Sequence, residues 1–583
     1  MKRSIALAMA ALLLVCLFAG CSNGGSTPTT TASTTAAAAA TTAAATAAPA
    51  ATTAAPAVTT AAPAATTAAP AATTAADPGA TPGYPLSAEP IYYSAMNAVP
   101  AQNVTGKWDD LHYFTAVGDL TNVYFNFANI AGTDYDTKMN LSLASGEIYD
   151  IYLSGVGQDN VRTYGMEGGL FLVLNDLIAN EMPQLMARNA EDPRMFKCVT
   201  ESDGNIYQFP QFVETATIAV ATIYTRLDFT EPVGYDEERI NGLKDITEVY
   251  DLFKAVQEAN AGNPEFVTLL PYSVGHLNGV VENYFFPAFG DDPFSGFVEN
   301  GSGTVSYNVA SDQMYRYLDF MHRLFEEKIL YNEIYTADTA TTTAITKANN
   351  SPFLSYGTML GYDNFASGNC DMIILPLVTS EYTDTIKCKG YDGVSATGRV
   401  ISSTCENPEI LCRYLDINYS IDEVAPGING LTNFLGVRGE DWDYTDDTRE
   451  FYEIFIPEGI NLSATEVNYS YRGPSIHAWC SIMAIQQGSS PGLTCKGVES
   501  LAKLYPYHIA PFPSSFLKYT SDESERYATL NTEIGEYVNS MKAKYISGAE
   551  SLDTWDTFVN TLNKMGVDEM VGIVQDAYTR YNG

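Results

Sequence analysis

Acidic side chains that stand close together in the sequence are the first candidates for chemistry. Asp291 and Asp292 are adjacent, and Asp441 and Asp443 flank Trp442. Two carboxyl groups held a few ångströms apart can hydrolyse a glycosidic bond, one as acid and the other as base or nucleophile. The chain holds 69 acidic residues, however, so neighbouring acids arise by chance. We therefore interpret these pairs as solvated loop residues.

The residue spacings do not match the known motifs for metal binding, nucleophilic catalysis or nucleotide binding. Asp441, Asp443, Asp446 and Asp447 could attract Ca²⁺, but the glycine and the terminal glutamate of an EF-hand loop are missing. The five histidines show no HExxH spacing. The sequence has neither a GxSxG nucleophile elbow nor a GxxxxGK(S/T) phosphate-binding loop. We expect no catalytic residue, no metal and no cofactor.

The N-terminus carries the signals of export and lipid attachment. Residues 1–3 are Met-Lys-Arg, residues 5–18 are almost wholly apolar, and residues 18–21 are Phe-Ala-Gly-Cys. This order is typical of a signal peptide over residues 1–20, and its end resembles the lipobox cut by the lipoprotein signal peptidase. The apolar run is shorter than the ~20 residues that a transmembrane helix needs. We expect lipid on Cys21, with an ordinary signal peptide and a chance cysteine as the alternative.

Residues 21–83 have the composition of a disordered tether. Thr, Ala, Pro and Ser make up almost all of residues 26–82, and a proline recurs every seven residues at Pro49, Pro56, Pro63 and Pro70. No regular set of large apolar residues occupies coiled-coil positions. Such a composition cannot bury enough apolar surface to offset chain entropy. We expect a spacer that holds a folded domain away from the membrane.

Residues 84–583 remain for the folded part. About 500 residues are too many for one hydrophobic core, so we expect two lobes. The chain has 31 basic and 69 acidic residues, a net charge of −38, which becomes −40 once Lys2 and Arg3 leave with the signal peptide. An acidic surface of this kind argues against nucleic acid and anionic membrane as partners.

The folded part contains an odd number of cysteines. They are Cys198, Cys370, Cys388, Cys405, Cys412, Cys480 and Cys495. No CxxC spacing indicates zinc, and an odd number leaves at least one thiol unpaired. Export permits disulfides, and buried free thiols are the alternative, so the sequence leaves both states open.

Strands and helices alternate at the start of the folded part. We predict strands at 91–93, 123–127 and 150–153, a helix that closes at residues 144–146, and a helix from 170 to near Pro183. The alternation indicates an α/β fold with parallel strands. Later helices are predicted after Ser311, near 521, and after Ser551 with Gly566 as the stop, followed by a last helix. Residues 331–350, rich in Thr and Ala, are interpreted as a surface insertion.

Several segments resemble the solute-binding lipoproteins of ABC importers. Lys138–Asp150 (KMNLSLASGEIYD) is similar to their KLNLMLASGDLPDI stretch, and Asp203–Tyr207 (DGNIY) to their DGKIYALP segment. The other matching segments are Gly169–Ile178, Tyr224–Asp228, Asn407–Asp416 and Trp555–Tyr581. The matches keep their order over about 450 residues and resemble the family 1-type binders of sugars and oligosaccharides.

The resemblance implies a two-lobed, periplasmic-binding-protein-like α/β fold with a helical C-terminal region. The two lobes would be discontinuous in sequence and would close on a ligand in the cleft between them. The implied ligand is a carbohydrate, and within that class an oligosaccharide. The implied partner is an ABC permease, and the implied location is the extracellular face of the cell membrane, where the protein is a lipid-anchored monomer without enzymatic activity.

Ligand-binding candidates follow from the chemistry of sugars. Aromatic rings stack on the apolar faces of sugar rings, and polar side chains bind the hydroxyl groups. Aromatic or acidic residues in loop-like, polar surroundings are the candidates, with core packing or a solvated loop as the alternative for each: Trp442, Trp479, Tyr207, Phe294, Glu147 and Tyr471. For Tyr284, Phe285 and Phe286 core packing is the favoured interpretation.

Taken together, the sequence predicts a binding component that captures a carbohydrate and delivers it to a permease. Three alternatives remain open. The chain could be a surface glycosidase or lyase, a receptor subunit that reports ligand occupancy to a sensor kinase, or a binder of a peptide or another small polar solute.

Overall fold

The computed structural model describes residues 83–215, 221–355, 372–390, 393–449, 451–462, 464–474, 478–482, 485–487 and 503–582. Cys21 and the predicted tether up to residue 82 lie outside this set, as do Cys370 and Cys495. Two large hydrophobic cores organise the described residues, and we call the regions around them the first and the second lobe.

The first lobe is built around a four-stranded sheet in the order β13-β3-β1-β2. The long strands β1 (Ile91–Val99) and β2 (Val123–Ala131) pair in parallel, as do β1 and β3 (Ile151–Tyr152), whereas β13 (Val400–Ile401) is antiparallel to β3. The helices of this lobe include α1 (His112–Thr121), α2 (Tyr135–Ser145), α4 (Asn175–Glu181), α5 (Pro183–Glu191), α6 (Arg194–Val199), α14 (Pro408–Asp416) and α15 (Thr432–Leu435). The predicted parallel α/β arrangement is confirmed.

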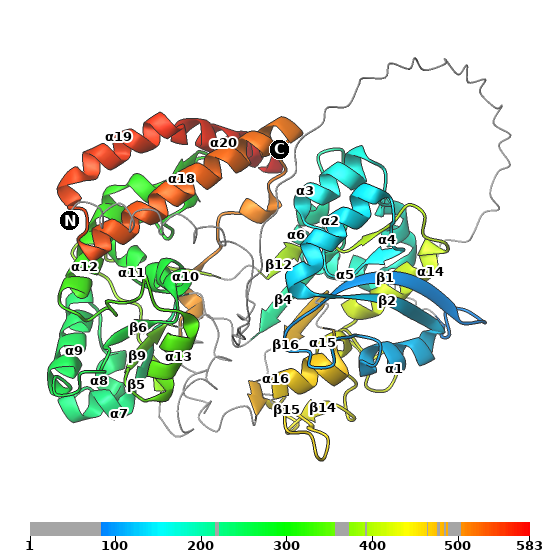
Figure 1. Ribbon diagram of the computed structural model, residues 1–583, viewed down its shortest axis with the longest axis horizontal. Helices are drawn as coiled ribbons and strands as arrows, with labels where there is room; N and C mark the ends of the chain where they lie inside the picture. Colours follow the sequence, from blue (N-terminus) through cyan, green and yellow to red (C-terminus); the bar gives the residue numbers. More distant parts are fainter. Residues whose placement is uncertain are drawn as a thin grey trace, which may run out of the picture. The chain divides into compact units, whose positions relative to one another are not determined.

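The second lobe contains a mixed sheet in the order β10-β5-β9-β6. Its strands are β5 (Tyr224–Arg226), β6 (Leu269–Pro271), β9 (Phe353–Ser355) and β10 (Met372–Ile374). The helices that contribute buried residues to its core include α9 (Ile246–Ala259), α11 (Glu282–Phe285), α12 (Asp312–Glu326), α18 (Ser521–Ser547), α19 (Trp555–Met565) and α20 (Val567–Asn582). Figure 1 shows each lobe taking segments from distant parts of the sequence: blue, cyan and yellow in the first, green, orange and red in the second.

A third sheet, with strand order β12-β4-β16, lies at three passages of the described chain between the two cores. Strand β4 (Pro210–Thr215) comes shortly before Ala221, which is the first residue of the second core. Strand β12 (Val394–Ala396) follows Cys388 of that core, and β16 (Trp479–Ile482) precedes Leu504 of that core. We call β12-β4-β16 the crossing sheet.

Local capping signals fix the C-terminal helices. Thr520 caps α18 through a capping box with Glu523, and the helix ends at Gly548 in the left-handed conformation. Ser551 caps the turn that leads into α19, and Gly566, with φ of 95°, ends α19. The helices predicted in this region are confirmed.

Two sequence predictions need correction. Residues 170–174 are not helical, because Phe171 forms a bridge with Ser402 and Leu172 N–H donates to the carbonyl of Ile401 at 2.9 Å. Residues 331–350 are not simply a surface insertion, because they contain helix α13 (Thr339–Lys347), whose Thr342 is buried and donates to the carbonyl of Tyr272 at 2.8 Å.

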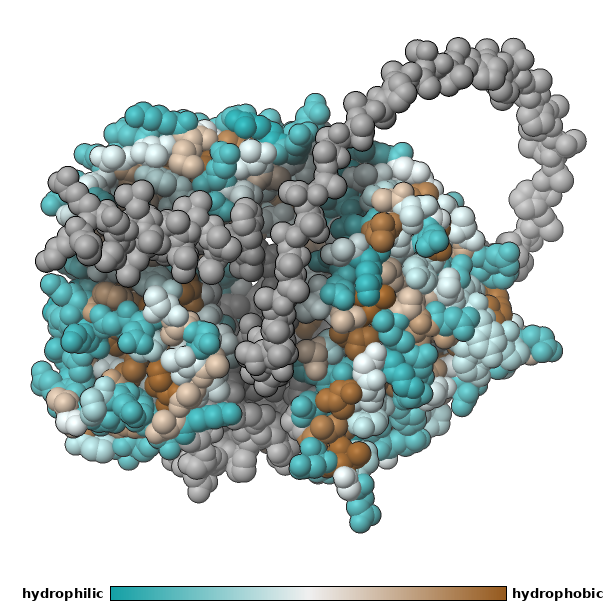
Figure 2. Space-filling model, in the orientation of Figure 1, coloured by the Kyte–Doolittle hydropathy of each residue, from teal (hydrophilic) through white to brown (hydrophobic). Residues whose placement is uncertain are grey.

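The five cysteines within the described residues are all buried, and four of them are free thiols: Cys388, Cys405, Cys412 and Cys480. None of the described helices combines the length and the apolar character of a bilayer-spanning helix. Among the coloured residues of the face shown in Figure 2, hydrophilic ones predominate, and hydrophobic residues form patches among them. Such a surface agrees with the acidic composition of the chain.

Candidate functional site

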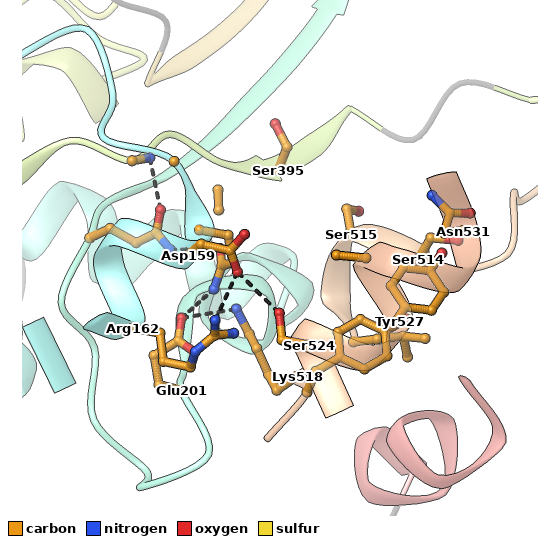
Figure 3. Close-up of a pocket in the computed structure, with 18 of the residues that line it drawn as sticks. Asp159, Arg162, Glu201, Ser395, Ser514, Ser515, Lys518, Ser524, Tyr527 and Asn531 are labelled. Atoms are coloured by element: carbon orange, nitrogen blue, oxygen red, sulfur yellow. Dashed lines mark hydrogen bonds and ion pairs between the residues drawn. The ribbon is translucent and has the colours of Figure 1, made fainter. Parts of the chain in front are cut away.

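A pocket of about 570 Å³ lies where the first lobe meets α18 of the second. The first lobe supplies α3 (Gln158–Asn160), the helical segment η2 (Val161–Glu167), and residues 395–398 at the end of the crossing sheet. The other wall consists of residues 514, 515 and 517–519 and the first turns of α18, as Figure 3 shows. This volume lies within the range of about 300–1,000 Å³ that is typical of small-molecule sites.

The floor of the pocket is a continuous chain of hydrogen-bonded side chains. Gly398 N–H donates to Gln208 Oε1 at 2.8 Å, and Gln208 Nε2 donates to Gln158 Oε1 at 3.0 Å. Gln158 Nε2 then donates to Glu201 Oε1 at 2.5 Å. Lys518 Nζ donates to the same Glu201 oxygen at 3.2 Å. Because the side-chain amides of Gln158 and Gln208 both have hydrogen-bond partners, the network fixes the orientation of these side chains on the floor of the pocket.

The Glu201–Lys518 ion pair is shielded from solvent. The side chains are 6% and 13% exposed, respectively, and Lys518 Nζ also donates to the carbonyl of Cys198 at 2.8 Å. Lys518 directly precedes the Tyr519-Thr520 entry into α18, so the pair connects the first lobe to the start of that helix. A buried pair of this kind fixes geometry, because either charge alone would be costly to leave unpaired.

The rim of the pocket carries a more exposed set of polar contacts. Asp159 Oδ1 accepts from Arg162 Nη2 at 3.0 Å and from Ser524 Oγ of α18 at 3.1 Å. Ser521 Oγ donates to Glu167 Oε1 at 2.5 Å. Beyond this rim lies a second hollow of about 260 Å³, which shares Asp159, Arg162 and Ser524 with the pocket and also includes Glu525. We call it the outer hollow.

Two tyrosines give the pocket its aromatic surface. The rings of Tyr519 and Tyr527 stack with centroids 4.9 Å apart and an interplanar angle of 12°. Burial raises the pKa of both hydroxyl groups, so both tyrosines are neutral at physiological pH. Together with serine, threonine, glutamine and asparagine side chains, this pair suits a ligand that has both apolar faces and many hydroxyl groups.

Trp442 is a core residue, contrary to the prediction that it contacts ligand. It is 1% exposed in strand β14 (Trp442–Tyr444), and its Nε1 donates to the carbonyl of Gly436 at 3.1 Å. Tyr444 and Tyr452 pack edge-on against its ring. A ring enclosed in this way has no face left for a ligand.

Trp479 belongs to the crossing sheet. Its ring stacks on Phe212 of β4 with centroids 4.4 Å apart, and the guanidinium carbon of Arg188 lies 5.3 Å from its centroid. These partners lock β16 against β4 and α5. They give the half-buried Trp479 a structural role and do not place it in the pocket lining.

The other four predicted residues are scattered. Tyr207 is 5% exposed, and its hydroxyl donates to Asp203 Oδ2 at 2.7 Å. Phe294 and Tyr471 are half-buried, and Glu147 is exposed in the turn after α2. None of these residues lines the pocket or the outer hollow. Tyr284, Phe285 and Phe286 are buried in the second core, as the sequence favoured.

The acidic pairs considered for catalysis have structural partners. Asp441 Oδ2 accepts from Val437 N–H at 2.7 Å and lies 2.7 Å from His112 Nδ1. The hydrogen bond to Asp441 raises the pKa of His112. In the other pair, Asp291 Oδ1 accepts from Thr383 Oγ1 at 3.2 Å, and burial raises the pKa of Asp292. Within the described residues no group of three or more His, Cys, Asp or Glu side chains is arranged to hold a metal ion.

Sequence reasoning missed the residues that line the pocket. Gln158, Asp159, Arg162 and Glu201 are isolated polar residues in the first lobe, and Lys518 lies more than 300 positions away from them. No spacing in the sequence connects these residues. The one local signal was the capped start of α18, which the sequence placed within a few residues.

The chain is similar to known substrate-binding and solute-binding proteins in sequence and in fold. The chain is 22% identical over 478 residues to the fructooligosaccharide ABC transporter substrate-binding protein FusA of Streptococcus pneumoniae. The aligned region covers 79% of this chain and 85% of FusA. An extracellular solute-binding protein from Bifidobacterium longum subsp. infantis superposes with a TM-score of 0.67 at 16% identity, over 85% of this chain and 99% of that one. The chain has the two-lobed fold of solute-binding proteins.

The fold is shared with binders of different ligands. The alginate-binding protein AlgQ2 superposes with a TM-score of 0.60 at 19% identity, over 85% of this chain and 99% of AlgQ2. No family model matches the chain. These likenesses confirm the resemblance to substrate-binding proteins of ABC transporters that the sequence motifs indicated.

Proposed function

We propose that this protein is the extracellular substrate-binding component of an ABC importer and that it captures an oligosaccharide between its two lobes. The observation that carries the proposal is the polar, tyrosine-bearing pocket between the first lobe and α18, in a two-lobed fold shared with such binders. Closure of the lobes around the sugar would present the loaded form to a permease. No bond is made or broken in this mechanism.

The location of the protein is part of the proposal. Lipid on Cys21 would hold the chain at the outer face of the membrane, and the Thr/Ala/Pro-rich segment would separate the lobes from that surface. A binding protein held near its permease has only a short distance over which to deliver its ligand. The protein acts in this scheme as a monomer, with the sugar and the permease as its partners.

A thermal unfolding screen tests the function. The Cys21→Ser protein would be heated with panels of oligosaccharides and of short peptides at millimolar concentration. A ligand present at 100 times its Kd adds about 2.7 kcal/mol to the free energy of unfolding, which is readily seen as a higher melting temperature. Stabilisation by oligosaccharides supports the proposal. Stabilisation by peptides alone, or the release of shortened sugar products during incubation, would refute it.

A further inference from the structure

The cations in the described lining of the pocket and of the outer hollow are both paired with acids. These cations are Arg162 and Lys518, and their partners are Asp159 at 3.0 Å and Glu201 at 3.2 Å. Figure 3 shows both ion pairs at the junction between the first lobe and α18. Within this described lining the pocket has two positive and two negative side chains, and their charges cancel.

Lys518 is poorly placed to bind a negatively charged ligand. Two of its three N–H donors are used, one by Glu201 and one by the carbonyl of Cys198. Its side chain is 13% exposed, and that of Glu201 is 6% exposed. A ligand carboxylate would have to displace Glu201, which would leave a buried carboxylate without its cation.

The outer hollow adds negative charge to the approach. Glu167 and Glu525 line it together with the Asp159–Arg162 pair, so its four charged side chains carry a net charge of −2. The whole chain carries −38. A net negative charge at the approach lowers the local concentration of negatively charged ligands.

We propose that the pocket selects uncharged oligosaccharides and excludes sugars that bear carboxylates, such as uronic acid oligomers. This inference rests on the proposed function and narrows its substrate class. The stacked Tyr519 and Tyr527 rings and the amide and hydroxyl side chains can contact a neutral sugar without disturbing either ion pair. The fold does not impose this choice, because a protein named for alginate binding shares it.

The test compares neutral and uronic acid oligosaccharides of equal length at low ionic strength, where the Debye length is about 30 Å at 0.01 M salt. Calorimetric titration of the Cys21→Ser protein should show binding of neutral oligosaccharides and at least tenfold weaker binding of uronates. The Glu167→Gln/Glu525→Gln variant should bind uronates about fivefold more tightly than its parent, because two repulsive charges are gone. Its affinity for neutral sugars is measured in the same titration, and a gain for neutral sugars equal to the gain for uronates would overturn the inference.

A matched control removes two acids from a different hollow. Glu238→Gln/Asp251→Asn makes the same change in net charge at residues outside the pocket, and it should leave uronate affinity unchanged. Uronates that bind the parent protein as tightly as neutral sugars, or more tightly, would overturn the inference and keep the proposed function. An unchanged uronate affinity in the Glu167/Glu525 variant would also overturn it. Failure of both ligand classes to bind would overturn the proposed function, and the inference with it.

Discussion

Replacing Lys518 by methionine would leave the buried Glu201 carboxylate without its cation. Glu201 would keep the hydrogen bond from Gln158 but lose the contact with Lys518 Nζ, and the Cys198 carbonyl would lose its hydrogen bond from the same Nζ. Breaking a buried ion pair by removing one partner costs about 3–5 kcal/mol. Because Gln158 still donates to Glu201, we expect a loss near the lower limit, about 3 kcal/mol.

Urea unfolding at pH 7, followed by far-ultraviolet circular dichroism and by tryptophan fluorescence, would measure this loss. With a slope of about 3 kcal/mol per molar urea, a loss of about 3 kcal/mol lowers the midpoint by about 1 M. Lys503→Met is the matched control, because Lys503 is exposed and its Nζ lies 3.5 Å from Asn241 Oδ1. That variant should change the free energy of unfolding by less than about 0.5 kcal/mol.

A double variant separates the ion pair from simple loss of packing. Glu201→Gln/Lys518→Met removes both charges, so it should recover most of the stability that Lys518→Met loses. The reasoning fails if Lys518→Met changes the free energy of unfolding by less than about 1 kcal/mol, or if the double variant is no more stable than the single one.

Four further outcomes are expected. Hydrogen bonding to Asp441 raises the pKa of His112 above its unfolded value. The contribution of protonated His112 to the free energy of unfolding is therefore complete below pH ~6.5 and is lost as the pH rises through the folded pKa. His112→Asn should lower the free energy of unfolding by about 1 kcal/mol at pH 5.5, as measured with urea, and by much less at pH 9. Trp442→Ala should lower the free energy of unfolding by about 3 kcal/mol while the folded protein keeps its sugar affinity, as measured by calorimetry. Tyr527→Ala should weaken sugar binding about tenfold in the same titration, with Tyr527→Phe close to wild type. Cys21→Ser should move the protein from the membrane fraction to the medium, as seen by immunoblotting.

Much of the fold could be predicted because its signals are local. Ser311 caps α12, and a regular spacing of buried residues along that helix marks its inner face. Gly146 and Gly566 end α2 and α19 in the left-handed conformation, which a sequence reader can anticipate from a glycine after an apolar repeat. The prediction failed at residues 170–174, where pairing with residues 401 and 402 overrides a helical pattern.

The site was harder to predict because burial depends on distant partners. Trp442 has acidic neighbours in the sequence, which suggested an exposed loop. In the structure Asp441 turns toward His112 and the Val437 amide, so the acid is satisfied and the indole packs inward. The pocket lining depends on contacts between residues far apart in the chain, such as Ser524 with Asp159. Such contacts leave no periodic pattern in the sequence.

The crossing sheet has a mechanical consequence. Its three strands, one at each passage between lobes, are hydrogen-bonded to one another, with Phe212 paired to Val394 on one side and to Trp479 on the other. A force applied to one of these strands is therefore transmitted to the other two through the hydrogen bonds of the sheet. Cutting the backbone at one of these passages would leave the other two passages and the hydrogen-bonded sheet between the lobes. In a protein cut at one passage, the sheet would still hold the two lobes next to each other. The lobes could then move relative to each other mainly by rotation about this sheet.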